Sequence, residues 1–342
     1  MKVAANGRFT LQPLTGVQRY AREISSRLAD RLDVLVPPGM FRGARGHLWE
    51  QTILPARTHG RLLWSPGNTG PLAVGKQVVT IHDCAVFDAP QGFTSAFAWW
   101  YRKLLPRLAR RVRRVLTVSE FSRQRLIEWC RLDPQRVTAV PNGVDSRFRP
   151  VAFSPQAPRP PIAGLPSSYV LCLGSLEPRK NLRRLLDAWR RAPELHSDLT
   201  LVLTGGNAGM FREAGLDPLP PSVLLTGRVA DEHLPALYAG ATMFVYPSLY
   251  EGFGLTVLEA MASGTPVICS NTTSLPEVAG DAACLIDPTD VDSLAAAMVR
   301  LANDAAERSE LRERGLARAE RFSWDAAADR TWSVLQEAAD EV

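Results

Sequence analysis

The chain has 342 residues, of which 46% are hydrophobic and 22% charged, and its formal net charge is +5. This length suggests two domains of ordinary size, and the composition is that of a soluble globular protein. No apolar run approaches the ~18–20 residues of a membrane-spanning helix, and the N-terminus lacks the apolar stretch of a signal peptide. The five cysteines are scattered singly, which favours reduced thiols in a cytoplasmic protein.

Short β-rich runs alternate with longer amphipathic helical patterns, which predicts parallel sheets with helices on both faces. In the first half we expect strands within residues 32–37, 61–66, 77–83, 113–119 and 137–143. In the second half we expect strands within residues 168–175, 199–206, 223–227, 242–248 and 265–271. This order predicts two α/β domains of similar size, residues 1–150 and 169–322, with a cleft between them.

Two further segments stand apart from these domains. Residues 151–168 are rich in proline and lack periodicity, which predicts a stiff interdomain linker. Residues 323–342 carry apolar side chains at helical spacing, among them Trp324, Trp332 and Leu335. Such a terminal helix must bury its apolar face, and the N-terminal domain is one surface on which it could pack.

Residues 93–125 combine aromatic side chains with a basic run. From Arg102 to Arg125 there are nine Lys or Arg residues and one acid, Glu120. A solvated basic helix face explains this pattern, and so does a peripheral contact with an anionic membrane surface. A nucleic-acid partner is disfavoured, because no binding motif is present and the aromatic residues lie upstream of the basic ones.

Residues 250–268 place two glutamates, Glu251 and Glu259, around a Gly-Phe-Gly turn between a predicted strand and a predicted helix. Open α/β sheets bind ligands at the carboxyl ends of their strands, and a helix N-terminus there favours phosphate. Gly252 and Gly254 let the backbone approach a ligand closely. A carboxylate can accept two hydroxyls, which suits the vicinal diol of a ribose or a hexose. Alternatively, Glu251 pairs with the helix dipole and Glu259 is a partly exposed helix residue.

Two glutamates separated by seven residues, with Gly-Phe-Gly after the first, resemble the donor-site signature of family 4 glycosyltransferases. Further blocks similar to this family run through nearly the whole chain in the family's order, at residues 14–24, 80–83, 118–126, 140–145, 174–189, 225–271 and 275–288. The resemblance implies a GT-B fold, in which two Rossmann-like doubly wound domains face each other across a cleft. It also implies retaining transfer of a hexose from a nucleotide sugar.

The resemblance implies a role for each matching residue of the second domain. Arg179 and Lys180 are expected to reach the diphosphate, Glu259 the ribose hydroxyls and Glu251 the sugar ring. Two cations can stabilise a departing diphosphate without a metal. The remaining donor-binding positions are expected at Gly174, Arg228, Val229, Gly252, Phe253, Gly254, Leu255 and Thr256. An exposed basic pair at a helix start would also explain Arg179 and Lys180, and Arg228 could be a surface charge.

In the first domain, the resemblance places His82 near the transferred sugar and therefore adds it to the catalytic set of Glu251, Arg179 and Lys180. Asp83, Gly16 and Val17 are expected to face the phosphates and the acceptor. A lone histidine is elsewhere more often structural.

No cofactor and no metal ion are expected beside the nucleotide-sugar donor. Asp290 and Asp292 mimic a metal-binding motif, but their place before a predicted helix favours capping. The resemblance favours GDP-mannose as donor, with UDP-sugars as the alternative. It favours a saccharide or lipid-linked saccharide of surface-polysaccharide assembly as acceptor, at the inner face of the plasma membrane. A non-catalytic membrane-associated adaptor is the alternative from another class, and a dehydrogenase is disfavoured because residues 204–209 lack GxGxxG spacing.

Overall fold

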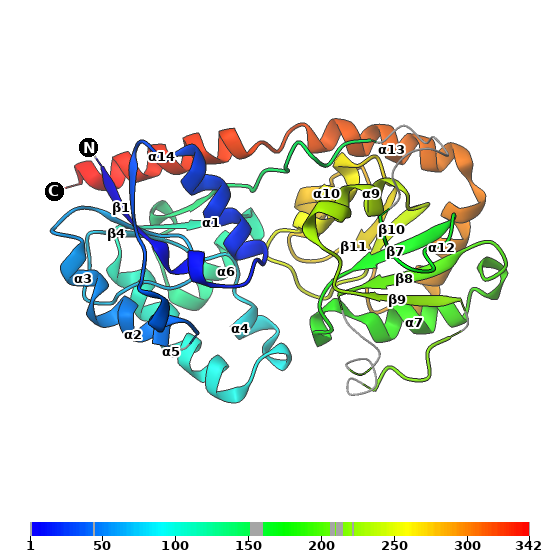
Figure 1. Ribbon diagram of the computed structural model, residues 1–342, viewed down its shortest axis with the longest axis horizontal. Helices are drawn as coiled ribbons and strands as arrows, with labels where there is room; N and C mark the ends of the chain where they lie inside the picture. The colour runs from blue at the N-terminus through cyan, green and yellow to red at the C-terminus, as the bar shows by residue number, and fades with distance from the viewer. Residues whose placement is uncertain are drawn as a thin grey trace. The chain divides into compact units, whose positions relative to one another are not determined.

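The computed structural model describes residues 2–43, 45–150, 160–205, 209, 215–220 and 222–341. The chain forms two compact units, shown in Figure 1: one combines Met1–Gly143 with Phe322–Val342, and the other is Val144–Arg321. Residues 151–159 of the predicted linker lie outside the described residues. The second unit begins before the predicted boundary at residue 150, because Arg147 pairs with Asp231 at 2.6 Å and Phe148 packs edge-on against Tyr238.

The first unit contains a sheet of six parallel strands in the order β2-β1-β3-β4-β5-β6. The strands are β1 (Val3–Asn6), β2 (Leu32–Leu35), β3 (Leu63–Ser65), β4 (Gln77–Thr80), β5 (Arg114–Thr117) and β6 (Val137–Ala139). The helices are α1 (Gly16–Arg27), α2 (Arg45–Thr52), α3 (Leu54–Arg57), α4 (Ala85–Asp88), α5 (Ser95–Arg111), α6 (Glu120–Cys130) and α14 (Trp324–Asp340). The sequence predicted five of these strands and missed β1, whose residues Val-Ala-Ala-Asn include a single β-branched side chain.

Helix α14 belongs to the first unit, although nearly two hundred residues separate it from β6. It packs against α1, where the Trp324 ring lies 6.3 Å from the Tyr20 ring, and Arg113 donates to the Ala338 carbonyl at 2.7 Å. A Cβ on Gly143 would lie 2.1 Å from the Trp324 backbone nitrogen, so the chain can pass here only as glycine. Trp332 was predicted on the buried face but is half-buried, and Arg31 covers its ring instead.

The second unit contains another sheet of six parallel strands, in the order β12-β11-β10-β7-β8-β9. The strands are β7 (Tyr169–Leu173), β8 (Thr200–Thr204), β9 (Val223–Gly227), β10 (Met243–Tyr246), β11 (Val267–Ser270) and β12 (Cys284–Ile286). The helices are α7 (Leu182–Arg190), α9 (Leu234–Ala239), α10 (Leu255–Ala262), α11 (Leu275–Ala279), α12 (Val291–Asn303) and α13 (Ala305–Ala319). The sequence missed β12, which has three residues.

In both units the strand order reverses once. In the first unit the reversal lies between β1 and β3, and in the second between β7 and β10. Doubly wound sheets bind their ligands at the carboxyl ends of the strands beside such a switch point. The fold therefore marks one candidate ligand position in each unit.

The part of the chain that the structure describes contains no helix with both the length and the apolar character needed to cross a membrane.

Candidate active site

The switch point of the second unit gathers charged residues from two loops. Arg179 and Lys180 form a 3₁₀ turn between β7 and α7, and Glu251 lies in the loop between β10 and α10. Because β7 and β10 are parallel neighbours, both loops leave the same edge of the sheet. The structure thus brings together three of the four residues predicted as catalytic.

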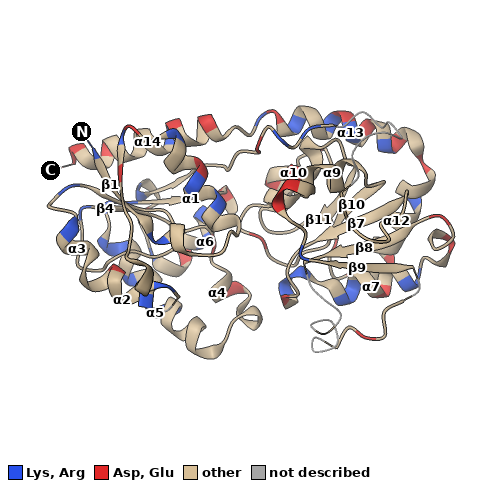
Figure 2. Ribbon diagram, viewed as in Figure 1, with Lys and Arg blue, Asp and Glu red and all other residues tan. Residues whose placement is uncertain are grey.

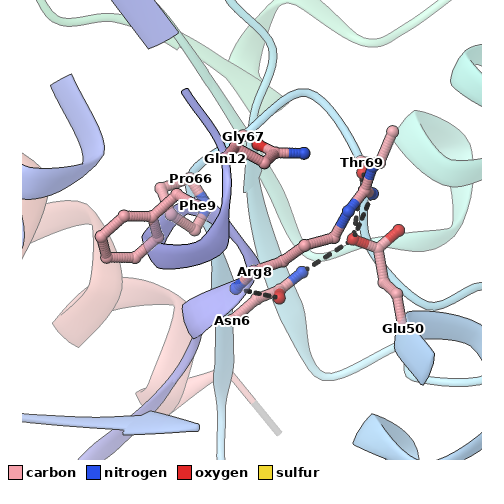
Figure 3. A pocket seen from close by; sticks show the side chains of 8 residues that line it. All are labelled: Asn6, Arg8, Phe9, Gln12, Glu50, Pro66, Gly67 and Thr69. Atoms are coloured by element: carbon pink, nitrogen blue, oxygen red, sulfur yellow. Dashed lines mark hydrogen bonds and ion pairs between the residues drawn. The ribbon is translucent and has the colours of Figure 1, made fainter. Parts of the chain in front are cut away.

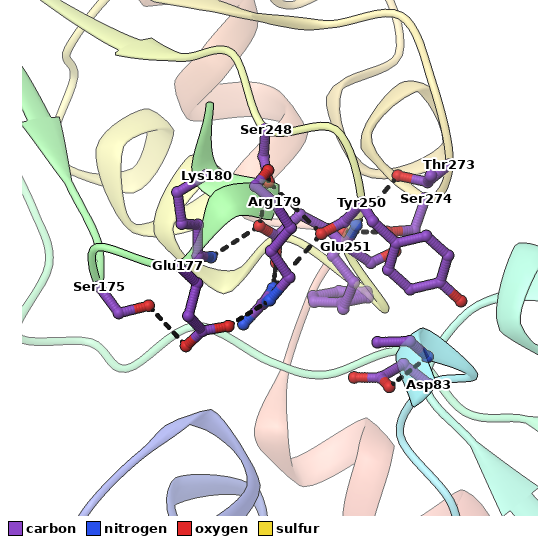
Figure 4. A network of polar contacts seen from close by, with 12 residues as sticks. Asp83, Ser175, Glu177, Arg179, Lys180, Ser248, Tyr250, Glu251, Thr273 and Ser274 are labelled. Carbon is purple, nitrogen blue, oxygen red and sulfur yellow. Dashed lines mark hydrogen bonds and ion pairs between the residues drawn. The ribbon is translucent and has the colours of Figure 1, made fainter. Parts of the chain in front are cut away.

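These three side chains form a close network (Figure 4). The Lys180 Nζ donates to Glu251 Oε1 at 2.6 Å, and Arg179 Nη1 donates to Glu251 Oε2 at 3.3 Å. Arg179 Nε also donates to Glu177 Oε2 at 2.6 Å. Two cations and two carboxylates therefore balance one another at the switch point.

Two hydroxyls that the sequence did not single out complete the network. Tyr246 donates to Glu251 Oε1 at 2.9 Å and Ser248 donates to the same oxygen at 2.6 Å, while Lys180 also contacts the Tyr246 hydroxyl. Both lie in "VYPS", at the end of β10, where polar residues follow buried ones. Their position at the carboxyl end of a strand could have indicated a functional role, but a tyrosine after an apolar run is typical of a core residue.

Burial and charge oppose each other at Glu251, which is only 8% exposed. Burial alone would raise the pKa of its carboxyl group, but the charges of Lys180 and Arg179 outweigh burial and hold this pKa below its usual range. Burial would lower the pKa of Lys180, yet the carboxylate of Glu251 keeps it raised. Burial and the same carboxylate raise the pKa of Tyr246 to about 12. Glu251 and Lys180 are therefore both ionised at neutral pH.

The Gly-Phe-Gly turn leads into α10 through a conformation that requires glycine. Gly254 has φ +117°, and a Cβ there would lie 2.7 Å from the Leu275 side chain. The Ser274 hydroxyl lies 2.9 Å from the Glu251 carbonyl oxygen and 2.8 Å from the Phe253 carbonyl oxygen, and it can donate its one hydrogen to either. The turn of Gly252, Phe253, Gly254, Leu255 and Thr256 is thus fixed at the first turn of α10, where helix N–H groups favour an anion.

Glu259 lies on the inner face of α10 and is 5% exposed. The Tyr238 hydroxyl donates to its Oε2 at 3.2 Å. The partly exposed position considered from the sequence is therefore wrong.

The other predicted donor positions also follow strands of this sheet. Gly174 follows β7, and a Cβ there would lie 3.5 Å from the Lys180 side chain. Arg228 and Val229 follow β9; Arg228 is exposed and Val229 half-buried.

His82 follows β4 in the first unit and has a buried ring. Its Nε2 donates to the Pro66 carbonyl at 2.9 Å, its backbone carbonyl accepts from Ser122 at 3.2 Å, and its ring packs edge-on against Tyr20. Burial lowers the pKa of His82 to about 4, so its ring is neutral at neutral pH. The ring can therefore orient its surroundings but supplies no positive charge.

The remaining first-unit predictions lie at the carboxyl ends of β1 and β4. Gly16 and Val17 begin α1, with Gly16 exposed and Val17 half-buried. The Asp83 carboxylate accepts from the Ala85 backbone N–H at 2.9 Å and so shapes the start of α4.

A small polar pocket lies at the switch point of the first unit, between β1 and β3 (Figure 3). It has an empty volume of about 220 Å³, part of it open to solvent, and is lined by Asn6, Arg8, Phe9, Gln12, Glu50, Pro66, Gly67 and Thr69. Glu50 is buried, and its Oε2 accepts from Asn6, Arg8 and Thr69 at 3.0–3.1 Å. Arg8 and Glu50 make the pocket neutral overall.

Among the described residues no group of three or more His, Cys, Asp or Glu side chains is placed to hold a metal ion. The Asp290 carboxylate accepts from the backbone N–H groups of Asp292 and Ser293 at 3.0 Å. The predicted role of Asp290 as the N-cap of α12 is confirmed.

Two doubly wound parallel sheets, one with a cation–carboxylate cluster at its switch point, define a nucleotide-binding α/β enzyme. Two family models match the chain: "Glycosyl transferases group 1" over residues 161–318 and "Glycosyltransferase Family 4" over residues 58–148. The O-antigen chain mannosyltransferase B of Escherichia coli is 32% identical, over 93% of this chain and 95% of that protein. The MMP alpha-(1->4)-mannosyltransferase of Mycolicibacterium hassiacum is 32% identical, over 79% of this chain and 68% of that protein.

Solved structures share the fold. Sucrose-phosphate synthase from Thermosynechococcus elongatus matches with a TM-score of 0.78 at 20% identity, over 98% of this chain and 99% of that one. Anabaena HepE, in complex with UDP and glucose, matches with a TM-score of 0.74 at 19% identity over the same shares. The chain belongs to the family 4 and group 1 glycosyltransferases: it has the GT-B fold and is a hexosyltransferase.

Proposed function

We propose that this enzyme transfers mannose from GDP-mannose to a saccharide or lipid-linked saccharide during surface-polysaccharide assembly. The observation that carries the proposal is the cluster of Arg179, Lys180 and Glu251 at the switch point of the second unit. Two relatives are mannosyltransferases, one of them for an O-antigen chain, which supports mannose and a polysaccharide product. A UDP-sugar donor is the alternative, supported by the UDP complex of HepE.

In this proposal the bond between the anomeric carbon and the phosphate oxygen breaks, and the departing diphosphate gains negative charge. Arg179, Lys180 and the first turn of α10 stabilise that charge, so no metal ion is needed. Glu259 holds the ribose hydroxyls and Glu251 the sugar ring. For retention of configuration, the acceptor hydroxyl enters on the face that the diphosphate leaves, and a phosphate oxygen takes its proton.

A single hydroxyl of the acceptor saccharide would use the pocket of the first unit, which has room for about one water molecule. Its lining offers an amide at Gln12, a hydroxyl at Thr69 and the charged pair of Arg8 and Glu50, while Figure 3 shows Phe9 and Pro66 on another side. Because the charged pair is neutral as a whole, the pocket suits hydroxyls better than a second phosphate. Asp83, Gly16 and Val17 follow the same edge of the sheet.

A thermal-shift comparison of GDP, UDP, ADP and dTDP tests the donor. A nucleotide present at 100 times its Kd adds ~2.7 kcal/mol of stability, which gives a clear rise in Tm. We expect GDP to give the largest rise, in the presence of EDTA, and NAD⁺ to give none. A larger rise in Tm with UDP would indicate a UDP-sugar donor in place of GDP-mannose. No rise with any of the nucleoside diphosphates would contradict the proposal.

We also propose that α5 brings the enzyme to the anionic inner face of the plasma membrane as a peripheral contact in the cytoplasm. Its exposed aromatic residues are Phe97, Trp99 and Trp100, which are 40%, 62% and 41% exposed. Lys103, Arg107 and Arg111 of the same helix are exposed basic residues. Figure 2 colours the Lys and Arg positions of the ribbon blue. Aromatic and basic side chains on one helix suit the interface of an anionic bilayer.

Several arginines of residues 93–125 have partners within the protein, and two of them contact the C-terminal segment. Arg113 bonds to the Ala338 carbonyl and Arg114 pairs with Glu341, so both hold α14 in place. A test variant should therefore leave them intact.

Co-sedimentation with anionic liposomes tests the contact. A variant with Trp99, Trp100, Arg107 and Arg111 changed to Ser should sediment less than the wild type at low salt, and high salt should weaken wild-type attachment. Trp129→Ser, at an exposed tryptophan of α6, is the matched control and should behave as wild type. Equal sedimentation of wild type and variant would remove the membrane contact.

A further inference from the structure

The Glu251 carboxylate accepts four hydrogen bonds, three of them on one oxygen. Its Oε1 accepts from Lys180, Tyr246 and Ser248, and its Oε2 accepts from Arg179. The two oxygens together offer about four acceptor positions. No position on Oε1 is left for a sugar hydroxyl while Lys180 stays bound.

The two cations direct most of their hydrogen bonds into this cluster. Lys180 contacts only Glu251 and Tyr246 among the hydrogen bonds of its ammonium group, and Arg179 divides its guanidinium between Glu177, Glu251 and the Tyr250 carbonyl. A diphosphate that approaches this site meets a cluster whose formal charges cancel. Its phosphate oxygens therefore compete with the carboxylates of Glu177 and Glu251 for the same two cations.

We propose that Tyr246 and Ser248 are positioning residues that hold Glu251 on Arg179 and Lys180 in the free enzyme, and that the donor diphosphate takes both cations over. The exchange frees a position on Glu251 Oε1 and lets this carboxylate turn to the transferred sugar. The inference rests on the proposed function, because it assigns the diphosphate and the sugar to this site.

Tyr246 and Ser248 are placed to hold the carboxylate while the cations move. Tyr246 is the last residue of β10 and is buried, and Ser248 is fully buried two residues on. Neither side chain needs to move for Lys180 to leave, because both donate directly to Glu251. Glu251 therefore keeps two neutral donors when its cationic donors are taken.

The affinity for nucleoside diphosphate distinguishes two models. In one the diphosphate replaces Glu251 on the cations, and in the other it adds contacts while Glu251 keeps its partners. Glu251→Gln removes the competing negative charge but keeps the size of the side chain. We expect calorimetry at low salt to show GDP or UDP, whichever the wild type prefers, binding about tenfold tighter to this variant. Inorganic pyrophosphate should follow the same order, while transfer is nearly lost.

Glu177→Gln is the matched control, since Glu177 also pairs with Arg179 but does not contact Lys180. It should tighten binding less than Glu251→Gln. Weaker or unchanged diphosphate binding by Glu251→Gln would overturn the exchange while leaving the proposed function intact. If the wild type binds no nucleoside diphosphate at all, the proposed function itself fails, and the exchange with it.

Steady-state kinetics test the positioning residues. Tyr246→Phe and Ser248→Ala should lower kcat about tenfold with little change in donor KM. Each removes a hydrogen bond that orients the Glu251 carboxylate, while Arg179 and Lys180 remain to bind the diphosphate. Ser248→Thr keeps the hydroxyl and should restore most of kcat. If Tyr246→Phe and Ser248→Ala lower only the Tm, with kcat of the folded enzyme unchanged, the two residues are structural and the positioning role is wrong.

Discussion

Lys180 and Glu251 lie 71 positions apart in the sequence and 2.6 Å apart in the structure. Each is costly to bury alone, and together with Arg179 and Glu177 they keep their charges inside a largely buried network. Removing either charge therefore affects its partner as well as a ligand. Experiments at this site have to separate the two effects.

Replacing both Arg179 and Lys180 with Ala should nearly abolish transfer and weaken diphosphate binding. One oxyanion-stabilising contact in a shielded site is typically worth ~3–4 kcal/mol, so the loss in kcat/KM should exceed ~10³-fold. Kinetics and calorimetry measure it. Arg183→Ala with Arg190→Ala, on α7, makes the same change in net charge and should keep wild-type activity. A double mutant at 179 and 180 that turns over at the wild-type rate would show that the phosphates bind elsewhere.

His82 should make the first unit sensitive to acid. Its pKa is about 4 in the fold and about 6.5 in an unfolded chain, so the unfolded state binds more protons between these values. Its contribution of up to ~3 kcal/mol is present above about pH 6.5 and is lost as pH falls towards about 4. His82→Gln should flatten the dependence of the urea midpoint on pH in this window. An unchanged slope in His82→Gln would mean that the ring has the same pKa in the folded and unfolded chain.

Asp290 and Asp292, whose spacing resembles a metal-binding motif, lie at the start of α12, where Asp290 caps the helix. Asp290→Ala should lower the free energy of unfolding by ~1 kcal/mol through loss of the α12 N-cap, with transfer in EDTA unchanged. Asp292→Ala, whose carboxylate faces Arg191 at the surface, should change stability less. Chemical denaturation and an activity assay with and without EDTA check both. Activity that requires a divalent metal and vanishes in either variant would make these aspartates ligands.

The sequence predicted ten of the twelve strands of the two sheets, because fully buried parallel strands leave long apolar runs bounded by turn residues. It missed β1 and β12, which each carry a single β-branched residue and are held by pairing with neighbouring strands. It also missed Tyr246 and Ser248. Their role depends on the side-chain contacts to Glu251, which no local pattern records.

For the whole molecule, the alternation of strands and helices was enough to predict two α/β domains. The first unit also needs α14 from the far end of the chain, which covers α1 and fixes Arg113. The amphipathic pattern of α14 predicted a buried face but left its partner open, because an apolar stripe does not specify the surface that covers it. The switch points follow only from strand order, which the sequence alone does not give.

The central claim is that the nucleotide-sugar donor binds at the second unit's switch point, on Arg179, Lys180 and Glu259. A crystal structure of the enzyme with bound GDP, grown with EDTA, tests it most directly. We expect phosphate oxygens within hydrogen-bond distance of Arg179 and Lys180, and ribose hydroxyls on Glu259. Glu251 should be separated from Lys180 but still bonded to Tyr246 and Ser248. A nucleotide bound at another strand edge, or one whose phosphates reach the protein only through a metal ion, would contradict it.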